Sequence, residues 1–467
     1  MERKVDVAII GAGSAGLYAL GQVRKHTDSW ALINGGELGT TCARVGCMPS
    51  KAAIQVADDF HRRKVFDRYG IEGMASLSLD ATEAMEHVRD LRDIFVDRVL
   101  EGSTDEMGEE FIDGYARFLE PTLLEVDGGQ RIRAARVIIA TGSRPLVPEA
   151  WNAFRDRVIT TDDLFELEDL PGSAAVVGLG AIGLEMGQAL SRMGVQVTGL
   201  DLAESIGGLE DAVAAKVAAD LIGSEFPLWL GAAAEVEPEG EALRVRSGER
   251  TVVVDRVLAA LGRVPNLERL ALDNLGVALD ARGVPVHDPE TMQIGNLPIF
   301  IAGDVTATRP ILHEAGDEGR IAGYNAVHEP VVRFQRRTPL AITFCDPNIA
   351  VVGQGLGQLD PEHTVIGEMQ LGPVGRALIM AKNKGVVRVY ADKASGEVLG
   401  ATLVAPKAEN LGHLLAWAIQ QRLTVLDLIR MPFYHPTIEE ALQAALYDAK
   451  GKLDLDAGDL PELTRLA

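Results

Sequence analysis

Two copies of one glycine-rich pattern place the strongest constraint on how this chain can fold. In the first copy, the apolar run from Val5 to Ile10 is followed by three glycines within residues 11–16 and then by a helix-compatible stretch. The second copy has its apolar run at 174–177, its glycines within 178–183 and its helical stretch at 184–193. Such short runs are typical of strands buried on both faces of a parallel sheet. The order of strand, glycine turn and helix predicts two nucleotide-binding βαβ units.

The glycines have a defined role in such a unit. They permit a tight turn and close approach of the backbone to a pyrophosphate, which then sits at the positive end of the following helix. One motif alone is weak evidence against an ordinary glycine-rich turn, but two copies, each after a buried strand, favour two nucleotide sites. The candidate phosphate-binding residues are Gly11, Gly13, Ser14, Ala15 and Gly16 in the first unit and Gly178, Gly180, Ile182 and Gly183 in the second.

The residue at the end of the second strand of each unit should bind ribose hydroxyl groups. In the second unit this residue is Asp201, and no Lys or Arg follows it closely. A carboxylate without a compensating cation disfavours a 2′-phosphate, so NAD is expected rather than NADP. The alternative for Asp201 is a solvated residue at a strand end. In the first unit Asn34 occupies the same place, so a neutral amide replaces the usual carboxylate.

Length, charge and cysteine content narrow the class of protein. The 467 residues suggest about three domains. Lys and Arg number 45 against 68 Asp and Glu, and the resulting net charge of -23 disfavours nucleic acid and anionic membranes as partners. No apolar run approaches the length of a membrane span. Asp6 interrupts the only stretch that resembles a signal peptide, and three cysteines do not form a disulfide scaffold, so a reducing cytoplasm is expected.

Cys42 and Cys47 lie in the most chemically informative segment of the chain. Residues five apart in a regular helix are separated by about 8 to 9 Å between Cα atoms, whereas a disulfide needs roughly 4.4 to 6.8 Å. A bridge therefore requires the backbone to depart from a helix, for which Gly46 and Pro49 are suited. Half of a zinc site or two inert thiols remain alternatives, although the preceding nucleotide motif favours redox chemistry. For Arg44, a solvated surface position is favoured over an effect on a thiolate pKa.

These motifs together resemble the pyridine nucleotide-disulfide oxidoreductase family, over essentially the whole chain. The resemblance rests on the two glycine motifs, the segment from Cys42 to Lys51, Ala140-Thr141-Gly142, Gly303-Asp304 and the segment from His435 to Glu440. Residues 312–319, Gly21 and Ser50 favour a lipoamide substrate over glutathione within the family. The implied reaction is oxidation of dihydrolipoamide with NAD, with a lipoyl-bearing carrier protein as a partner.

The resemblance also implies the architecture. We expect an α/β protein with two Rossmann-like domains that bind FAD and NAD, followed by a C-terminal α+β dimerisation domain. The predicted segments are 1–148 for FAD, 149–264 for NAD, 265–337 for a central segment that completes the FAD site, and 338–467 for the dimer interface.

Six residues receive chemical roles from the resemblance. Cys47 would face the flavin and Cys42 would exchange with the substrate. Lys51 would lie near the flavin and pair with Glu185, and His435, oriented by Glu440, would accept a proton in the other subunit of a homodimer. Further cofactor contacts are implied at Asn34, Thr41, Lys51, Ala140, Thr141, Gly142, Asp201, Gly262, Arg263, Gly303, Asp304, Leu312 and His313.

Several residues depart from the family pattern and leave other functions open. Thr40 replaces a glycine, and Ala43 and Arg44 replace Leu or Val and Asn between the cysteines. The alternatives are an NADH-dependent reductase of another small, glutathione-like disulfide, or a noncatalytic subunit that retains FAD. Cys345 is expected to be a buried residue in a strand of the dimerisation domain, and no metal is expected.

Overall fold

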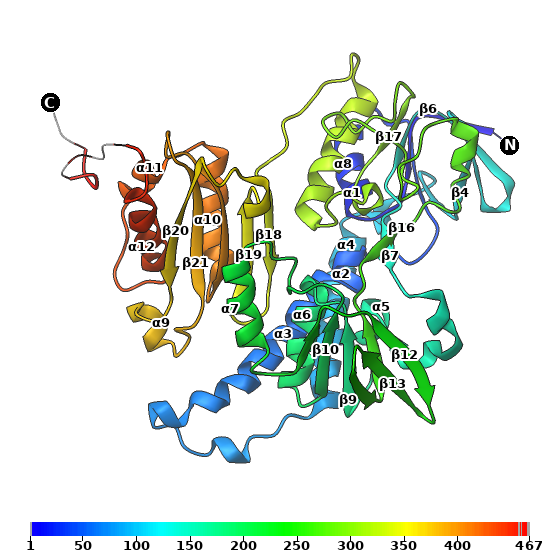
Figure 1. The fold of residues 1–467 in the computed structure, drawn as a ribbon. Helices are drawn as coiled ribbons and strands as arrows, with labels where there is room; N and C mark the ends of the chain where they lie inside the picture. Colours follow the sequence, from blue (N-terminus) through cyan, green and yellow to red (C-terminus); the bar gives the residue numbers. More distant parts are fainter. Residues whose placement is uncertain (1, 456–457, 459, 465–467) are drawn as a thin grey trace. The chain divides into compact units, whose positions relative to one another are not determined.

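The structure is a computed structural model that describes residues 2–455, 458 and 460–464 (Figure 1). Contacts divide the chain into two compact units, each built from segments that are distant in sequence. The first unit contains the chain up to Ala52, Glu86–Leu146 and Gly262–Arg336. The second contains Ala53–Met85, Val147–Leu261 and the chain from Arg337 on. The predicted division into four segments stays a prediction.

A seven-stranded sheet forms the core of the first unit. Its strands are β1 (Glu2–Ile10), β2 (Trp30–Asn34), β3 (Phe111–Asp113), β4 (Ala116–Glu120), β5 (Leu123–Val126), β6 (Gln130–Ile139) and β17 (Ile299–Ile301). β3, β2, β1, β6 and β17 pair in parallel, and β5 and β4 extend the sheet in antiparallel order. Val7, Ile9 and Leu32 are fully buried, as a strand covered on both faces requires. The first predicted βαβ unit is therefore present as β1, a helix and β2.

Two helices pack beside each other against this sheet, α1 (Ser14–Val23) and α8 (Leu312–Val327) (Figure 1). Glycines allow their close approach. A Cβ atom at Gly319 would lie 2.3 Å from the Ala15 carbonyl oxygen, and one at Gly323 would lie 2.4 Å from the Ala19 carbonyl oxygen. The glycines of α8 thus allow this helix to lie directly against α1, the helix that follows the first glycine turn.

The region between β2 and β3 is mainly helical. It contains α2 (Thr41–Arg44), α3 (Cys47–Arg62) and α4 (Ala81–Glu101), with short 3₁₀ turns between α3 and α4. No helix in the described part of the chain is both long and apolar enough to cross a membrane.

The second unit contains its own five-stranded parallel sheet. Its strands are β8 (Val158–Ile159), β9 (Ser173–Val177), β10 (Gln196–Asp201), β11 (Leu228–Leu230) and β15 (Arg256–Ala259), and its helices are α5 (Thr161–Leu164), α6 (Ala181–Arg192) and α7 (Ala212–Ile222). β9, α6 and β10 form the second predicted βαβ unit. An antiparallel sheet of β12 (Ala234–Glu239), β13 (Ala242–Ser247) and β14 (Arg250–Val254) follows.

The C-terminal part of the second unit is an antiparallel sheet with helices, in agreement with the expected α+β class. Its strands are β18 (Leu340–Thr343), β19 (Asn348–Gly353), β20 (Thr364–Gln370), β21 (Val386–Asp392) and β22 (Val398–Ala405), and its helices are α9 (Gly375–Ile379), α10 (Ala408–Gln420), α11 (Val425–Ile429) and α12 (Glu439–Lys450). α10 and α12 pack on the sheet through one apolar cluster. Cys345 is buried but lies in the turn after β18, so its predicted place in a strand is wrong.

Candidate active site

The first glycine turn is shaped by steric contacts that only glycine avoids. Gly11 has a φ of 112°, and a Cβ atom there would lie 2.3 Å from the Ala140 carbonyl oxygen. A Cβ atom at Gly16 would lie 1.9 Å from the Gly11 carbonyl oxygen, whereas one at Gly13 would meet open space. Gly13 caps α1 without a side-chain hydrogen bond, and the first turn contains no acid. Ser14, Ala15 and their neighbours therefore present backbone N–H groups to an anion such as a pyrophosphate.

The second glycine turn repeats this geometry. Cβ atoms at Gly178 and Gly183 would lie 2.3 Å from the Ala260 carbonyl oxygen and 1.8 Å from the Gly178 carbonyl oxygen, while Gly180 again faces open space. Gly180 caps α6, which holds Ile182 in its first turn, without a side-chain bond or a nearby acid. Both turns thus fit the phosphates of a dinucleotide.

The strand-end residues differ between the units. Asp201 accepts the Leu179 N–H at 2.6 Å through one carboxylate oxygen and the Ala203 N–H at 2.8 Å through the other. Asn34 accepts the Ala12 N–H at 3.0 Å, but its amide nitrogen donates to the Gly36 carbonyl oxygen at 2.9 Å. Both side chains therefore join the glycine turn to the end of the second strand, one as a carboxylate and one as an amide.

A pocket of about 480 Å³ opens beside Asn34 in the first unit. Three of its lining residues, Gly11, Asn34 and Thr141, are among the predicted cofactor contacts. The pocket is also lined by residues that the sequence analysis missed, which are Tyr115, Arg144, Asn266, Glu268 and Arg269. A cavity with a ring, backbone edges and a strand-end amide fits the adenosine part of FAD.

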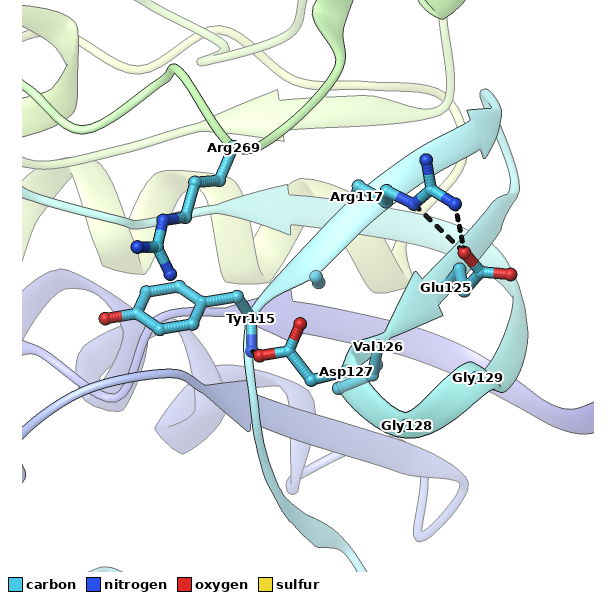
Figure 2. A pocket seen from close by; sticks show the side chains of 9 residues that line it. Tyr115, Arg117, Glu125, Val126, Asp127, Gly128, Gly129 and Arg269 are labelled. Carbon is cyan, nitrogen blue, oxygen red and sulfur yellow. Dashed lines mark hydrogen bonds and ion pairs between the residues drawn. The ribbon is translucent and has the colours of Figure 1, made fainter.

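Tyr115 forms one wall of this pocket and of a neighbouring one. A Cβ atom at Gly35 would lie 2.5 Å from the Tyr115 ring, and the Arg269 guanidinium lies 4.0 Å from the ring centroid on a cation–π contact. Figure 2 shows Arg269 over this ring in the neighbouring pocket of about 430 Å³, with the Arg117–Glu125 ion pair on the opposite side. Gly114, which follows β3 directly, is the sequence feature from which a turn beside this pocket could have been predicted.

A hydrogen-bonded group connects two more predicted contacts of the first unit, Arg263 and Asp304, through Ser143. β7 (Ser143–Pro145) and β16 (Arg263–Pro265) pair in antiparallel order, directly after Gly142 and Gly262. The Ser143 hydroxyl donates to Asp304 at 3.0 Å, and Arg263 Nε donates to the Ser143 hydroxyl oxygen at 2.7 Å. These bonds hold Asp304 in place beside the Arg263 guanidinium. A carboxylate that accepts hydrogen bonds from a chain of hydroxyl groups needs such a fixed position.

The segment after β17 is fixed by a buried carboxylate. Gly303 donates its N–H to Glu318 at 2.8 Å, and Arg336 pairs with Glu318 at 3.1 Å. Burial raises the pKa of Glu318, although the charge of Arg336 and these bonds oppose the shift. Leu312 and His313 begin α8 on the same segment.

Cys42 and Cys47 lie on either side of a break between two helices. α2 ends at Arg44, Val45 leaves the helical region with a φ of -135°, and α3 begins at Cys47. Cys42 is half-buried and Cys47 is exposed. A hydrogen bond with Cys47, burial and the neighbouring thiol raise the pKa of Cys42, and Lys51 opposes this shift. The two thiols therefore interact, and the cation whose charge acts on Cys42 is Lys51.

Lys51 and Glu185 stand on different units, so their predicted pairing stays a prediction. Lys51 Nζ donates to the Ser50 hydroxyl oxygen at 3.4 Å, and Thr41 is exposed at the start of α2. Glu185 is buried in α6 and accepts the Phe344 N–H at 2.8 Å.

His435 and Glu440 form a pair in the second unit. The atoms His435 Nδ1 and Glu440 Oε1 share a hydrogen bond of 2.8 Å, and the other Glu440 oxygen accepts the Thr437 N–H at 3.0 Å. The bond with His435 lowers the pKa of Glu440. The His435 side chain is 79% exposed, so its second ring nitrogen is accessible for proton transfer.

The sequence analysis missed a buried ionic cluster around Arg192, at the end of α6. Arg192 donates to Glu225 through Nε at 2.8 Å and through Nη2 at 2.7 Å, and it also pairs with Asp58 and Asp346. Gln188, one helical turn earlier, accepts the Asp346 N–H at 2.7 Å. The described residues contain no group of three or more His, Cys, Asp or Glu side chains that could hold a metal ion. The cluster joins α6 to the segment after β18.

Comparisons with known proteins agree with the resemblance of the motifs. Residues 5–319 match the family model of pyridine nucleotide-disulphide oxidoreductases, and residues 340–446 match the dimerisation domain of that family. The chain is 31% identical to a dihydrolipoyl dehydrogenase of Haloferax volcanii, over 96% of each chain. It is 29% identical to a mercuric reductase of Lysinibacillus sphaericus, over 95% of this chain and 82% of the relative. The crystal structure of LpdA from Mycobacterium tuberculosis matches with a TM-score of 0.83 and 26% identity, over 95% of this chain and 99% of that one.

Proposed function

We propose that this chain, which belongs to the pyridine nucleotide-disulphide oxidoreductase family, is a dihydrolipoyl dehydrogenase that oxidises dihydrolipoamide and reduces NAD. The observation that carries the proposal is the interacting pair of Cys42 and Cys47 at the break between α2 and α3. The dimerisation domain at 340–446 supports a homodimer. A lipoyl group on a carrier protein is the proposed natural substrate.

FAD and NAD are the cofactors of a protein of this kind. Bound FAD supplies a two-electron carrier between a dithiol and a pyridine nucleotide. The first glycine turn, Asn34 and the pocket lined by Tyr115 fit FAD, and Asp304 is placed to accept hydrogen bonds from its ribityl chain. The second turn with Asp201 fits NAD, because the carboxylate would repel the phosphate of NADP.

The cysteines carry the exchange with the substrate. One sulfur of dihydrolipoamide attacks Cys42 of the oxidised pair, and Cys47 leaves as a thiolate. The second substrate sulfur then displaces Cys42 from the mixed disulfide, which closes the lipoamide ring and leaves the pair reduced. The positive charge of Lys51 favours the thiolate form of Cys42 against the effect of burial.

His435 is the proposed proton acceptor, and it serves the site of the partner subunit. Its bond to Glu440 orients the ring, while the exposed nitrogen takes the proton from the attacking substrate thiol. The buried carboxylate of Glu185 is the proposed partner of Lys51. A noncatalytic role is disfavoured because Cys42, Cys47, His435 and Glu440 are all retained.

One observation favours a second candidate. Arg44 stands between the cysteines where the family pattern has Asn, and its guanidinium pairs with a carboxylate. This favours an NADH-dependent reductase of another small disulfide as the alternative to lipoamide.

The proposal is tested by steady-state turnover of dihydrolipoamide with NAD and with NADP, using the purified holoprotein. Cys47→Ser should keep bound flavin and lose disulfide turnover, while Cys345→Ala, a control at the buried third cysteine, should keep both. Unchanged turnover in Cys47→Ser would remove that thiol from the reaction. Reduction of another disulfide by NADH without lipoamide turnover would select the second candidate.

A further inference from the structure

The pocket beside Asn34 spans the carboxyl ends of three neighbouring strands in the first unit. The strand order β2, β1, β6 places Gly11, which follows β1, between Asn34 at the end of β2 and Thr141 just after β6. All three residues line the pocket. A ribose attached to a phosphate at the Gly11 turn would therefore have Asn34 on one side and the wall that begins at Thr141 on the other.

Asn34 presents only a neutral amide on its side of the pocket. Its oxygen accepts the Ala12 N–H at 3.0 Å, and its nitrogen donates to the Gly36 carbonyl oxygen at 2.9 Å. Both polar atoms are thus bonded to the backbone. In the second unit, Asp201 also bonds to the backbone through both oxygens, but a carboxylate has about four acceptor positions and keeps its charge for a ribose. The strand end of the first unit provides no such anionic acceptor.

An acidic side chain lies instead on the wall of the pocket formed by the segment after β16. Among the described residues that line the pocket, Glu268 is the only acid. Both terminal nitrogens of Arg144 donate to the two Glu268 oxygens, and the Leu267 N–H donates to one of these oxygens at 3.2 Å. Partial burial acts to raise the pKa of Glu268, but the bonds from Arg144 and the backbone outweigh it and lower the pKa. The side chain is 59% exposed, so this fixed carboxylate is accessible to a ligand.

The groups that support Glu268 belong to the same wall of the pocket. Arg144 also donates to the Asn266 side-chain oxygen at 3.0 Å. Asn266 in turn donates to the Thr141 carbonyl oxygen at 3.0 Å, and the Thr141 hydroxyl donates to the Asn266 carbonyl oxygen at 2.7 Å. The carboxylate is therefore connected through two side chains to the residue that follows β6, beside the first glycine turn.

We propose that Glu268 is the acidic hydrogen-bond acceptor for the adenosine ribose of FAD, in place of the strand-end acid that Asn34 replaces. The inference rests on the proposed function, which places FAD in the first unit, and it adds a residue that recognises the ribose. The ribose hydroxyl groups donate to the Glu268 carboxylate, which Arg144 holds in position. Because Arg144 balances its charge, this acceptor does not repel an added phosphate as the unpaired carboxylate of Asp201 does.

The test compares FAD with an analogue that carries 2′,3′-dideoxyadenosine. The full-length apoprotein is reconstituted with each compound, and flavin fluorescence gives the two dissociation constants. Their ratio reports the ribose hydroxyl groups alone, because the flavin, the phosphates and the adenine are the same in both. The wild-type protein should prefer FAD by on the order of tenfold, and Glu268→Ala should reduce this preference to about twofold.

Two further variants control the comparison. Glu268→Gln keeps an uncharged acceptor of the same shape and should give an intermediate ratio. Glu125→Ala removes an acid that pairs with Arg117 in the neighbouring pocket (Figure 2) and should keep the wild-type ratio. If Glu268→Ala weakens the binding of both compounds by the same factor, the proposal is overturned, since Glu268 would then only hold the wall of the pocket. A wild-type protein that binds the two compounds equally would overturn it as well.

Failure of this inference can be distinguished from failure of the proposed function. The dissociation constants are measured without a disulfide or NAD. Absence of dihydrolipoamide turnover in the wild-type protein would therefore reject the dehydrogenase assignment, while the ratio would still accept or reject Glu268. A ratio that Glu268→Ala leaves unchanged, in a protein that oxidises dihydrolipoamide, would reject the inference alone.

Discussion

The two glycine-rich units have the same turn geometry, but the side chain at the strand end is neutral in the first unit and charged in the second. In each unit the strand-end side chain accepts the N–H that follows the first glycine, from Ala12 in one and Leu179 in the other. Each strand-end side chain also bonds to the backbone two residues beyond itself, and here the direction of the hydrogen bond differs between the units. Asp201 accepts an N–H from Ala203, while Asn34 donates to the carbonyl oxygen of Gly36. The steric rule for the turn is shared, but the side chain at the strand end must match the orientation of the next peptide group.

This difference in charge predicts which kind of nucleotide each unit prefers. The second unit places a carboxylate at the strand end, where the ribose of NAD is proposed to bind. The first places a neutral amide there, in a pocket that Arg144 and Arg269 also line. We expect the second unit to exclude an added phosphate and the first to be indifferent to it.

The largest expected effects come from the open glycines. Gly13 and Gly180 have φ values of -79° and -70°, which alanine adopts freely, and a Cβ atom at either would meet nothing within 4 Å. The methyl group should therefore leave the thermal midpoint unchanged but occupy the phosphate position, weakening nucleotide binding by on the order of a hundredfold. Gly13→Ala should reduce flavin content, and Gly180→Ala should raise the KM for NADH with flavin retained.

Each of these variants serves as the control for the other. A Gly180→Ala protein that loses flavin, or a Gly13→Ala protein that keeps it at the wild-type dissociation constant, would break the assignment of one nucleotide to each unit.

Asp201→Asn should produce the next largest change. The amide retains the acceptor for one N–H but turns a donor toward the other, and it removes the negative charge from the acceptor that is proposed for ribose. We expect the KM for NADH to rise about tenfold and the preference for NADH over NADPH to fall. A preference that is unchanged, measured by kcat/KM for both nucleotides, would remove Asp201 from cofactor selection.

Asn34→Asp tests the opposite substitution. An oxygen would replace the nitrogen that lies 2.9 Å from the Gly36 carbonyl oxygen, and the resulting repulsion should weaken FAD binding about fivefold. Flavin fluorescence on reconstitution of the apoprotein measures the dissociation constant. Tighter binding in this variant would show that the turn adapts to a carboxylate and that the polarity of the peptide does not select the residue.

Tyr115→Leu should have the smallest effect. It removes the ring that stacks on Arg269, and a contact of this kind contributes about 0.5–1 kcal/mol at an exposed site. The FAD dissociation constant should rise about two- to fivefold. Trp229→Leu removes a similar arginine contact, 6.0 Å from Arg250, in the second unit and should leave flavin binding unchanged.

Local patterns were sufficient to predict the two βαβ units, because buried strands and glycine turns are encoded by residues that are adjacent in sequence. The second helix, predicted at 184–193, is α6 at Ala181–Arg192, an offset at the capping glycine that periodicity alone cannot resolve. Of the cofactor contacts that the sequence predicts in the first unit, Gly11, Asn34 and Thr141 line the first pocket.

Contacts between distant segments could not be predicted in the same way. Tyr115 and Arg269 are in contact although they are 154 positions apart in the sequence, and no periodic pattern marks either residue. Arg44, expected at the surface, is partly exposed, but no pattern in the sequence marks its pairing with Glu37 in the loop after β2. Cys345 was placed in a strand because its apolar neighbours suggested one, but the strand ends at Thr343.

The cluster around Arg192 has a consequence for how this sequence can vary. Its guanidinium, 3% exposed, is shared by the carboxylates of Asp58, Glu225 and Asp346, which come from three separate segments. Loss of Arg192 would leave these carboxylates without their shared cation in a desolvated site, at a cost of about 3–5 kcal/mol. Substitutions at these four positions should therefore be inherited together, so that a lineage either keeps the whole set or replaces it with apolar residues.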